Sequence, residues 1–234
     1  MVRRIIVAVC WVCCCLLFAG ACRPEAETPD RESRAGNAPV PGRKTIVALG
    51  DSLTYGDGVA AGDAYPAVLA ERLRKEGREF QVINAGVKGE ASSGTLFRTP
   101  NLIKTLHPDI LILCTGANDG LRNIKPAVLR TNLDRILTML RQSHVRVILV
   151  GMQAFFPARP DYRQEFDAVY PEIAQKHGVI FVPFLLEGIA GDPELMQEDE
   201  LHPNADGYGK VVDILYPHVI QAIEEAVEKH PKAE

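Results

Sequence analysis

Cysteine is nearly absent from this 234-residue chain once its first 21 residues are set aside. Four of the six cysteines lie within residues 10–15, and only Cys22 and Cys114 follow them. Cys22 stands about 20 residues before the first expected strand, whereas Cys114 lies in an apolar run, where a thiol serves as a small core residue. We therefore expect no intramolecular disulfide, which excludes a disulfide-stapled scaffold.

The chain also lacks a long basic run and a hydrophobic run long enough to cross a membrane comfortably. A net charge of −4 argues against nucleic-acid binding through phosphate neutralisation. The one long apolar run, Ile5–Phe18, has 14 residues, which is short for a membrane span. Arg3-Arg4 precedes it and Ala19-Gly20-Ala21 follows it, so we assign residues 1–21 to a signal peptide and expect export.

The segment LFAGAC, residues 17–22, resembles the lipobox of bacterial lipoproteins, although Ala19 stands where leucine is usual. The resemblance implies lipidation of Cys22 and a membrane anchor in the cell envelope; ordinary cleavage with a spare cysteine, and a soluble periplasmic product, is the alternative. Residues 22–43 are polar and contain four prolines, which predicts a disordered tether. Residues 44–230 then form the folded domain.

Within that domain, apolar runs alternate with helical patterns. The runs cover residues 45–49, 80–84, 109–115, 145–151 and 179–183, and the helical patterns cover about 65–77, 95–107, 126–142, 161–177 and 203–229. Nearly continuous apolar strands alternating with helices indicate a parallel sheet that is covered on both faces. We predict a three-layer α/β, flavodoxin-like fold with five parallel strands in the order 2-1-3-4-5.

Chemistry-bearing residues follow several of these strands. GDSL, residues 50–53, follows the first strand, a glycine-rich loop at 84–94 follows the second, and GANDG at 116–120 follows the third. DELHPN, residues 199–204, precedes the last helix. Open α/β sheets place their sites at the carboxyl ends of the strands, so these segments are expected to meet at one edge.

Ser52 is the serine that stands at a strand-to-helix turn, as an acyl-transfer nucleophile would. Asp199 lies three residues before His202, so its carboxylate can bind one ring nitrogen and leave the other for Ser52. Alternatively, Asp199 caps a helix and His202 is a bystander. Asn118 is similarly either a turn residue or an oxyanion donor.

Other polar residues receive structural roles. Ser92 and Ser93 are assigned to a turn that caps a helix, and Asp119 to holding its own turn. Asp51 is assigned to shaping its loop. The five histidines other than His202 are expected at the surface.

Taken together, GDSL at 50–53, the glycines of 84–94, GAND at 116–119 and DELH at 199–202 resemble the SGNH, or GDSL, hydrolase superfamily. The resemblance is closest to its acyl-CoA thioesterase I, lysophospholipase L1 and arylesterase branch. It implies that Ser52 is the nucleophile, His202 the general base and Asp199 the residue that orients His202. It also implies an oxyanion hole made by the Ser52 N–H, a glycine N–H and the Asn118 side chain.

Two glycines compete for the second oxyanion donor. Counting five residues past Asn84, as in this branch, selects Gly89, whereas Gly86 fits less well. The same branch implies that Leu121, Phe156 and Pro157 line the acyl site.

The expected function is hydrolysis of carboxylic esters or thioesters, such as short-chain or aryl esters and lysophospholipids, by a monomer without a metal or cofactor. A metal site among residues 198–202 is disfavoured because it lacks a second histidine. An envelope or polysaccharide O-acetylesterase is the alternative enzyme, although the only tryptophan, Trp11, lies in the signal peptide. A non-catalytic envelope binding module is the alternative of a different class.

Overall fold

The computed structural model describes residues 38–154 and 158–228, which form a parallel sheet between two layers of helices. The strands are β1 (Lys44–Gly50), β2 (Phe80–Gly86), β3 (Ile110–Cys114), β4 (Arg146–Val150) and β5 (Ile180–Val182). Every pairing is parallel, in the order β2-β1-β3-β4-β5. The predicted sheet and its order are confirmed.

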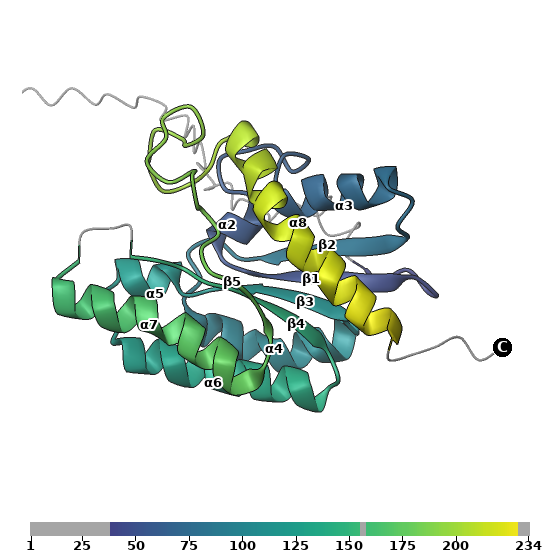
Figure 1. Cartoon of the computed structure of the whole chain (residues 1–234), viewed down its shortest axis with the longest axis horizontal. Helices are drawn as coiled ribbons and strands as arrows, with labels where there is room; N and C mark the ends of the chain where they lie inside the picture. The colour runs from purple at the N-terminus through teal and green to yellow at the C-terminus, as the bar shows by residue number, and fades with distance from the viewer. Residues whose placement is uncertain (1–37, 155–157, 229–234) are drawn as a thin grey trace, which may run out of the picture. The chain divides into compact units, whose positions relative to one another are not determined.

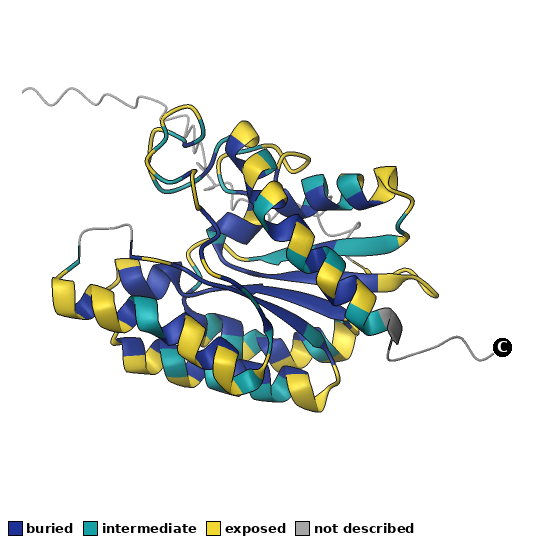
Figure 2. Cartoon of the chain, viewed as in Figure 1, coloured by how far each residue is buried: buried dark blue, intermediate teal, exposed yellow. Residues whose placement is uncertain are grey.

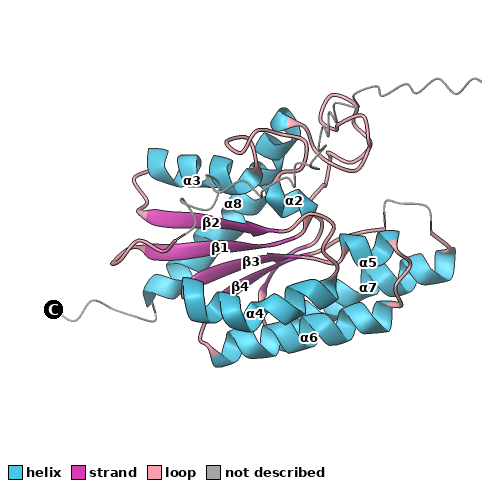
Figure 3. Ribbon diagram, turned by 180° about the vertical axis from the view of Figure 1, so that it is seen from behind, coloured by secondary structure: helices cyan, strands magenta, loops and turns pink. Residues whose placement is uncertain are grey.

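Helices cover both faces of the sheet (Figures 1 and 3). They are α2 (Ser52–Tyr55), α3 (Tyr65–Lys75), α4 (Ser92–Leu106), α5 (Ala117–Leu121), α6 (Pro126–Gln142), α7 (Pro160–His177) and α8 (Ala205–Glu228). Helices α3 and α8 pack on one face, whereas α4, α6 and α7 pack on the other. The loops after β1, β2 and β3 are left at the carboxyl edge, where the expected site lies.

The core forms because the central strands carry apolar side chains on both faces. All five residues of β3 are buried, as are the last six residues of β1 (Figure 2). Helix α8 packs against β4 and β5 and adds Val211, Leu215, Val219 and Ile223 to the same core; these residues recur every four positions and are at most 4% exposed. Cys114 is buried and free, as expected for a core thiol.

Two glycines let α2 approach the ends of the strands. A Cβ on Gly50 would lie 2.2 Å from Thr54 Oγ1 and 2.3 Å from the carbonyl oxygen of Cys114. A Cβ on Gly86 would lie 2.2 Å from the backbone nitrogen of Tyr55. Both positions therefore require glycine, because any side chain there would push the Ser52 helix off the sheet.

Helix α4 begins three residues earlier than expected, so the assignment of Ser92 and Ser93 to a capping turn is wrong. Ser92 is the first helical residue, and Ala91 takes the N-cap position without a side-chain hydrogen bond. The reason is tertiary: Ser92 donates both its N–H and its hydroxyl to Asp119, at 2.7 and 2.6 Å. The predicted signal peptide, Cys22, most of the tether, Phe156 and Pro157 lie outside the described residues.

Candidate active site

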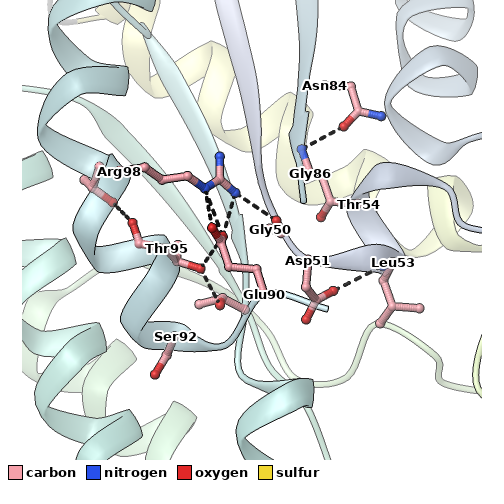
Figure 4. A network of polar contacts seen from close by, with 12 residues as sticks. Gly50, Asp51, Leu53, Thr54, Asn84, Gly86, Glu90, Ser92, Thr95 and Arg98 are labelled. Atoms are coloured by element: carbon pink, nitrogen blue, oxygen red, sulfur yellow. Dashed lines mark hydrogen bonds and ion pairs between the residues drawn. The ribbon is translucent and has the colours of Figure 1, made fainter. Parts of the chain in front are cut away.

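The candidate nucleophile stands where β1 passes into α2. Asp51 occupies the N-cap of α2, and its Oδ1 accepts the N–H of Leu53 at 3.1 Å. This cap, drawn in Figure 4, agrees with the loop-shaping role expected for Asp51. Ser52 is the first helical residue, so its N–H is one of the first-turn donors that have no acceptor within the helix.

Ser52, His202 and Asp199 are brought into one hydrogen-bonded series. The Ser52 hydroxyl lies 2.9 Å from His202 Nε2, and His202 Nδ1 lies 2.6 Å from Asp199 Oδ2. Because the carboxylate can only accept, Nδ1 carries the proton and Nε2 is left to accept from the serine. This is the arrangement that a nucleophile and its general base require.

The Asp199 carboxylate also holds the loop that carries the histidine. Its Oδ1 accepts the backbone N–H groups of Leu201 at 2.9 Å and His202 at 3.0 Å. Burial alone would raise the pKa of Asp199, but the hydrogen bonds from His202 and Leu201 outweigh it and lower that pKa. Asp199 is therefore a carboxylate at neutral pH, as its orienting role requires.

Gln197 ties this late loop to the segment after Ser52. Its Nε2 donates to the carbonyl oxygen of Asp57 at 2.7 Å and to that of Pro203 at 2.8 Å. Its backbone N–H donates to the carbonyl oxygen of His202 at 2.8 Å. One side chain thus joins two segments that are about 140 residues apart in the sequence and that carry the nucleophile and the base.

The hydrogen bonds separate the two glycines proposed as oxyanion donors. The Gly86 N–H donates to Asn84 Oδ1 at 2.9 Å and is therefore occupied. The Gly89 N–H has no acceptor among the described residues, and Gly89 takes a φ of 68° that favours glycine. The Asn118 side chain, in a residue that is 9% exposed, likewise has no hydrogen-bond partner within residues 38–154 and 158–228. These observations favour Gly89 and Asn118 as donors.

Arg122 binds the carbonyl group of Gly89. Its Nη2 donates to the Gly89 carbonyl oxygen at 2.7 Å. Arg122 directly follows α5, the helix that carries Asn118. The loop after β2 is therefore tied at Gly89 to the residue that directly follows the Asn118 helix.

Asp119 does not hold its own turn, so that expectation is wrong. Residues 117–121 form the short helix α5, and the Asp119 carboxylate reaches across to Ser92. Asn132 of α6 completes the buried group by donating to the Ser92 hydroxyl at 2.8 Å. The sequence pattern cannot show this contact, because its partners are 27 and 40 residues apart.

Asp51, the residue before the nucleophile, is fully buried. It is 0% exposed, and its Oδ2 has no hydrogen-bond partner among the described residues. Burial raises the pKa of Asp51 to about 7, against the lowering effects of the Leu53 N–H and of His202; the Glu90 carboxylate raises it further. The charge of this carboxyl group therefore changes near neutral pH.

Glu90 and Arg98, which no sequence pattern singles out, occupy the centre of a polar network beside the nucleophile turn (Figure 4). Arg98 Nε lies 2.9 Å from both Glu90 oxygens, and its Nη2 lies 2.8 Å from Oε2. The only signal in the sequence is that a glutamate directly follows Gly89 and that an arginine follows it eight residues later.

Of the three residues expected to line the acyl site, one lies within the described residues. Leu121 ends α5 and is 44% exposed, whereas Phe156 and Pro157 lie outside the described residues. His177 is not a surface residue as expected: its side chain is 4% exposed and lies 2.7 Å from Asp134. Within the described residues, no group of His, Cys, Asp or Glu side chains could hold a metal ion, and no helix is long and apolar enough to cross a membrane.

Comparison with known proteins identifies the family. The model of the GDSL-like lipase/acylhydrolase family matches residues 48–210, which include Ser52, Gly89, Asn118, Asp199 and His202. The chain belongs to this family. It is a carboxylic ester hydrolase with the SGNH-hydrolase fold.

Three members of the family illustrate the similarity. The chain is 33% identical to Esterase TesA of Pseudomonas aeruginosa over 174 residues, which cover 74% of this chain and 87% of that protein. It is also 33% identical to thioesterase 1/protease 1/lysophospholipase L1 of Escherichia coli K12, over 72% of this chain and 80% of that protein. The crystal structure of AlinE4, an SGNH-hydrolase family esterase, is 36% identical with a TM-score of 0.63, over 78% of this chain and 98% of that one.

Proposed function

We propose that this GDSL-family hydrolase is a serine esterase that cleaves carboxylic esters and thioesters through an acyl-enzyme on Ser52. The observation that carries the proposal is the hydrogen-bonded series of Ser52, His202 and Asp199, with heavy-atom distances of 2.9 and 2.6 Å. The first distance lies within the reach of a general base for its proton, and the second is a hydrogen bond that can orient that base.

In this mechanism His202 Nε2 accepts the proton of Ser52 as the hydroxyl oxygen attacks the ester carbonyl carbon. The N–H groups of Ser52 and Gly89 and the side-chain amide of Asn118 stabilise the negative oxygen of the tetrahedral intermediate. His202 then donates its proton to the leaving alcohol or thiol, and the acyl-enzyme forms. A water molecule repeats the sequence on the acyl carbon, with His202 again as the base, and releases the acid.

The proposed substrates are small: short-chain and aryl esters, and lysophospholipids. Leu121 stands three residues after Asn118 on α5 and offers an exposed apolar side chain to an acyl group. Similar proteins include the arylesterase of Vibrio mimicus and the thioesterase 1/protease 1/lysophospholipase L1 of Escherichia coli K12, which supports this range. Preference for acetyl groups on polysaccharides is the alternative, and a chain-length series distinguishes the two.

Hydrolysis of p-nitrophenyl acetate, butyrate, octanoate and laurate by the wild type and by Ser52→Ala tests the mechanism. We expect Ser52→Ala to lose activity on every ester and to lose labelling by a fluorophosphonate. Ser143→Ala is the matched control, because Ser143 is an exposed serine at a helix end. Hydrolysis by Ser52→Ala at the wild-type rate would refute the mechanism, and a strict acetyl preference would favour the O-acetylesterase.

We also propose that the protein is exported and anchored in the cell envelope through lipidated Cys22. The support is the basic and apolar N-terminus and the lipobox-like LFAGAC. Labelled palmitate should be incorporated into the wild type and not into Cys22→Ala. Equal release of both proteins in soluble form would contradict the anchor.

A further inference from the structure

The Glu90 carboxylate is connected to the chain at the carboxyl ends of three adjacent strands, β2, β1 and β3. Glu90 itself lies in the loop after β2, directly after Gly89. Through Arg98 it reaches the end of β1, and through Thr95 it reaches the residue after β3. The three proposed oxyanion donors stand on these same three segments.

The connection to β1 runs through Arg98 of α4. Its guanidinium holds Glu90 with Nε and Nη2, and Nη2 also donates to the carbonyl oxygen of Gly50 at 2.9 Å. The same carbonyl oxygen accepts the N–H of Val87 at 3.0 Å. Gly50 stands two residues before Ser52. The planar guanidinium of Arg98 therefore links the turn that carries the nucleophile to the loop that carries Gly89 (Figure 4).

The connection to β3 runs through a pair of threonines. Thr95 donates its hydroxyl to Glu90 Oε2 at 2.9 Å, and its Oγ1 lies 2.8 Å from Thr115 Oγ1. Since a hydroxyl has one proton and Thr95 gives its proton to Glu90, Thr115 is the donor to Thr95. Thr115 stands three residues before Asn118, in the segment that leads into α5.

The pairing also settles the charge of the network. A lone carboxylate beside Gly89 would oppose the negative oxygen that forms during ester cleavage. The Glu90 and Arg98 side chains are only 10% and 22% exposed, so water screens them little, and the guanidinium 2.8 Å away opposes the charge of the carboxylate. The network can therefore fix geometry without weakening oxyanion binding.

We propose that Glu90, held by Arg98 and Thr95, is a positioning residue that sets the relative places of the three oxyanion donors. The inference rests on the proposed serine mechanism and adds residues that act without touching substrate. A misplacement of about 1 Å can lower the rate about 10²-fold. Loss of the Glu90 carboxylate should therefore lower kcat.

Glu90→Gln tests the proposal, because it keeps the size of the side chain and removes the charge and one acceptor oxygen. We expect kcat for p-nitrophenyl butyrate to fall about 10- to 100-fold while KM changes less than about threefold. The dissociation constant of phenylboronic acid, whose serine adduct is tetrahedral, should rise in step with the loss of kcat. Arg98→Lys should lower kcat by a similar factor. The double variant should have a kcat no lower than that of the less active single variant, because both changes break the same contact.

The ion pair between Arg130 of α6 and Glu172 of α7 provides the matched control. Arg130 Nε and Nη2 each lie 3.0 Å from Glu172 Oε2, and these side chains are 38% and 55% exposed. Glu172→Gln and Arg130→Lys should leave kcat and KM within about twofold of the wild type. Equal losses of kcat in the control pair and in Glu90→Gln would overturn the proposal, because any broken ion pair would then suffice.

A second pair of variants decides the matter if Glu90→Gln does not fold. Thr95→Val removes the hydroxyl while keeping the shape, and it should lower kcat severalfold; Thr95→Ser should recover most of that loss. A wild-type kcat in Thr95→Val, or in folded Glu90→Gln, overturns the positioning role. If Ser52→Ala is inactive at the same time, the serine mechanism is retained. Activity retained in Ser52→Ala instead removes the serine mechanism itself.

Discussion

Replacing Asp199 with asparagine separates the two tasks of that carboxylate. Oδ1 accepts two backbone N–H groups and shapes the loop, whereas Oδ2 accepts from His202 Nδ1. Asparagine keeps an oxygen for the first task and places an NH2 group opposite Nδ1. The imidazole must then carry its proton on Nε2, where it can no longer accept the proton of Ser52.

The size of the expected loss follows from the exposure of the pair. With a buried aspartate, the same change in a Ser-His-Asp triad lowers kcat about 10⁴-fold. Here the Asp199 side chain is 44% exposed and that of His202 is 17% exposed, so water can partly replace the carboxylate. We therefore expect kcat to fall about 10²- to 10³-fold, which corresponds to about 3–4 kcal/mol of transition-state stabilisation.

Steady-state hydrolysis of p-nitrophenyl butyrate and thermal unfolding measure the two tasks separately. Asp199→Asn should keep its Tm within a few degrees of the wild type, because the backbone hydrogen bonds persist. Asp192→Asn is the control, since Asp192 also accepts a backbone N–H, from Glu194 at 2.9 Å, without facing a histidine. If Asp199→Asn keeps more than about a third of the wild-type kcat, the orienting role is refuted.

Two further predictions concern the oxyanion donors and the buried acid. Asn118→Ala should lower kcat about 10²- to 10³-fold with little change in KM, and a rise in KM at unchanged kcat would contradict a donor role. Asp51→Asn should keep the cap to Leu53 and gain stability relative to the wild type as the pH rises from about 4 to about 7. Burial raises the pKa of Asp51 to about 7, so the protonated acid favours folding at low pH and that contribution, up to about 4 kcal/mol, is lost over this range. Urea unfolding at about pH 5 and pH 8 measures the free energy of unfolding of both proteins. If the difference between Asp51→Asn and the wild type does not increase with pH, the raised pKa of Asp51 is contradicted.

The sheet could be predicted because its strands are short, apolar and buried on both faces, as residues 46–50 of β1 and 110–114 of β3 show. The contact of Ser52 with His202 and Asp199 could be predicted because Ser52 closely follows a strand and the other two residues lie three positions apart. The start of α4 could not, since Ser92 is held by Asp119, 27 residues away. Local pattern carries no information about such a partner.

The sequence by itself determined the parallel sheet, the edge at which Ser52, Asn118 and His202 meet, and the family of hydrolases to which the chain belongs. The family resemblance already favoured Gly89 over Gly86 by position, but only the tertiary structure shows the physical difference between these two glycines. Gly86 packs against the backbone of Tyr55 and donates its N–H to Asn84, whereas the Gly89 N–H has no acceptor in the part of the chain that the structure describes. The physical reason is packing. The role of each glycine depends on the backbone and side-chain groups that contact it, and some of these come from distant parts of the chain.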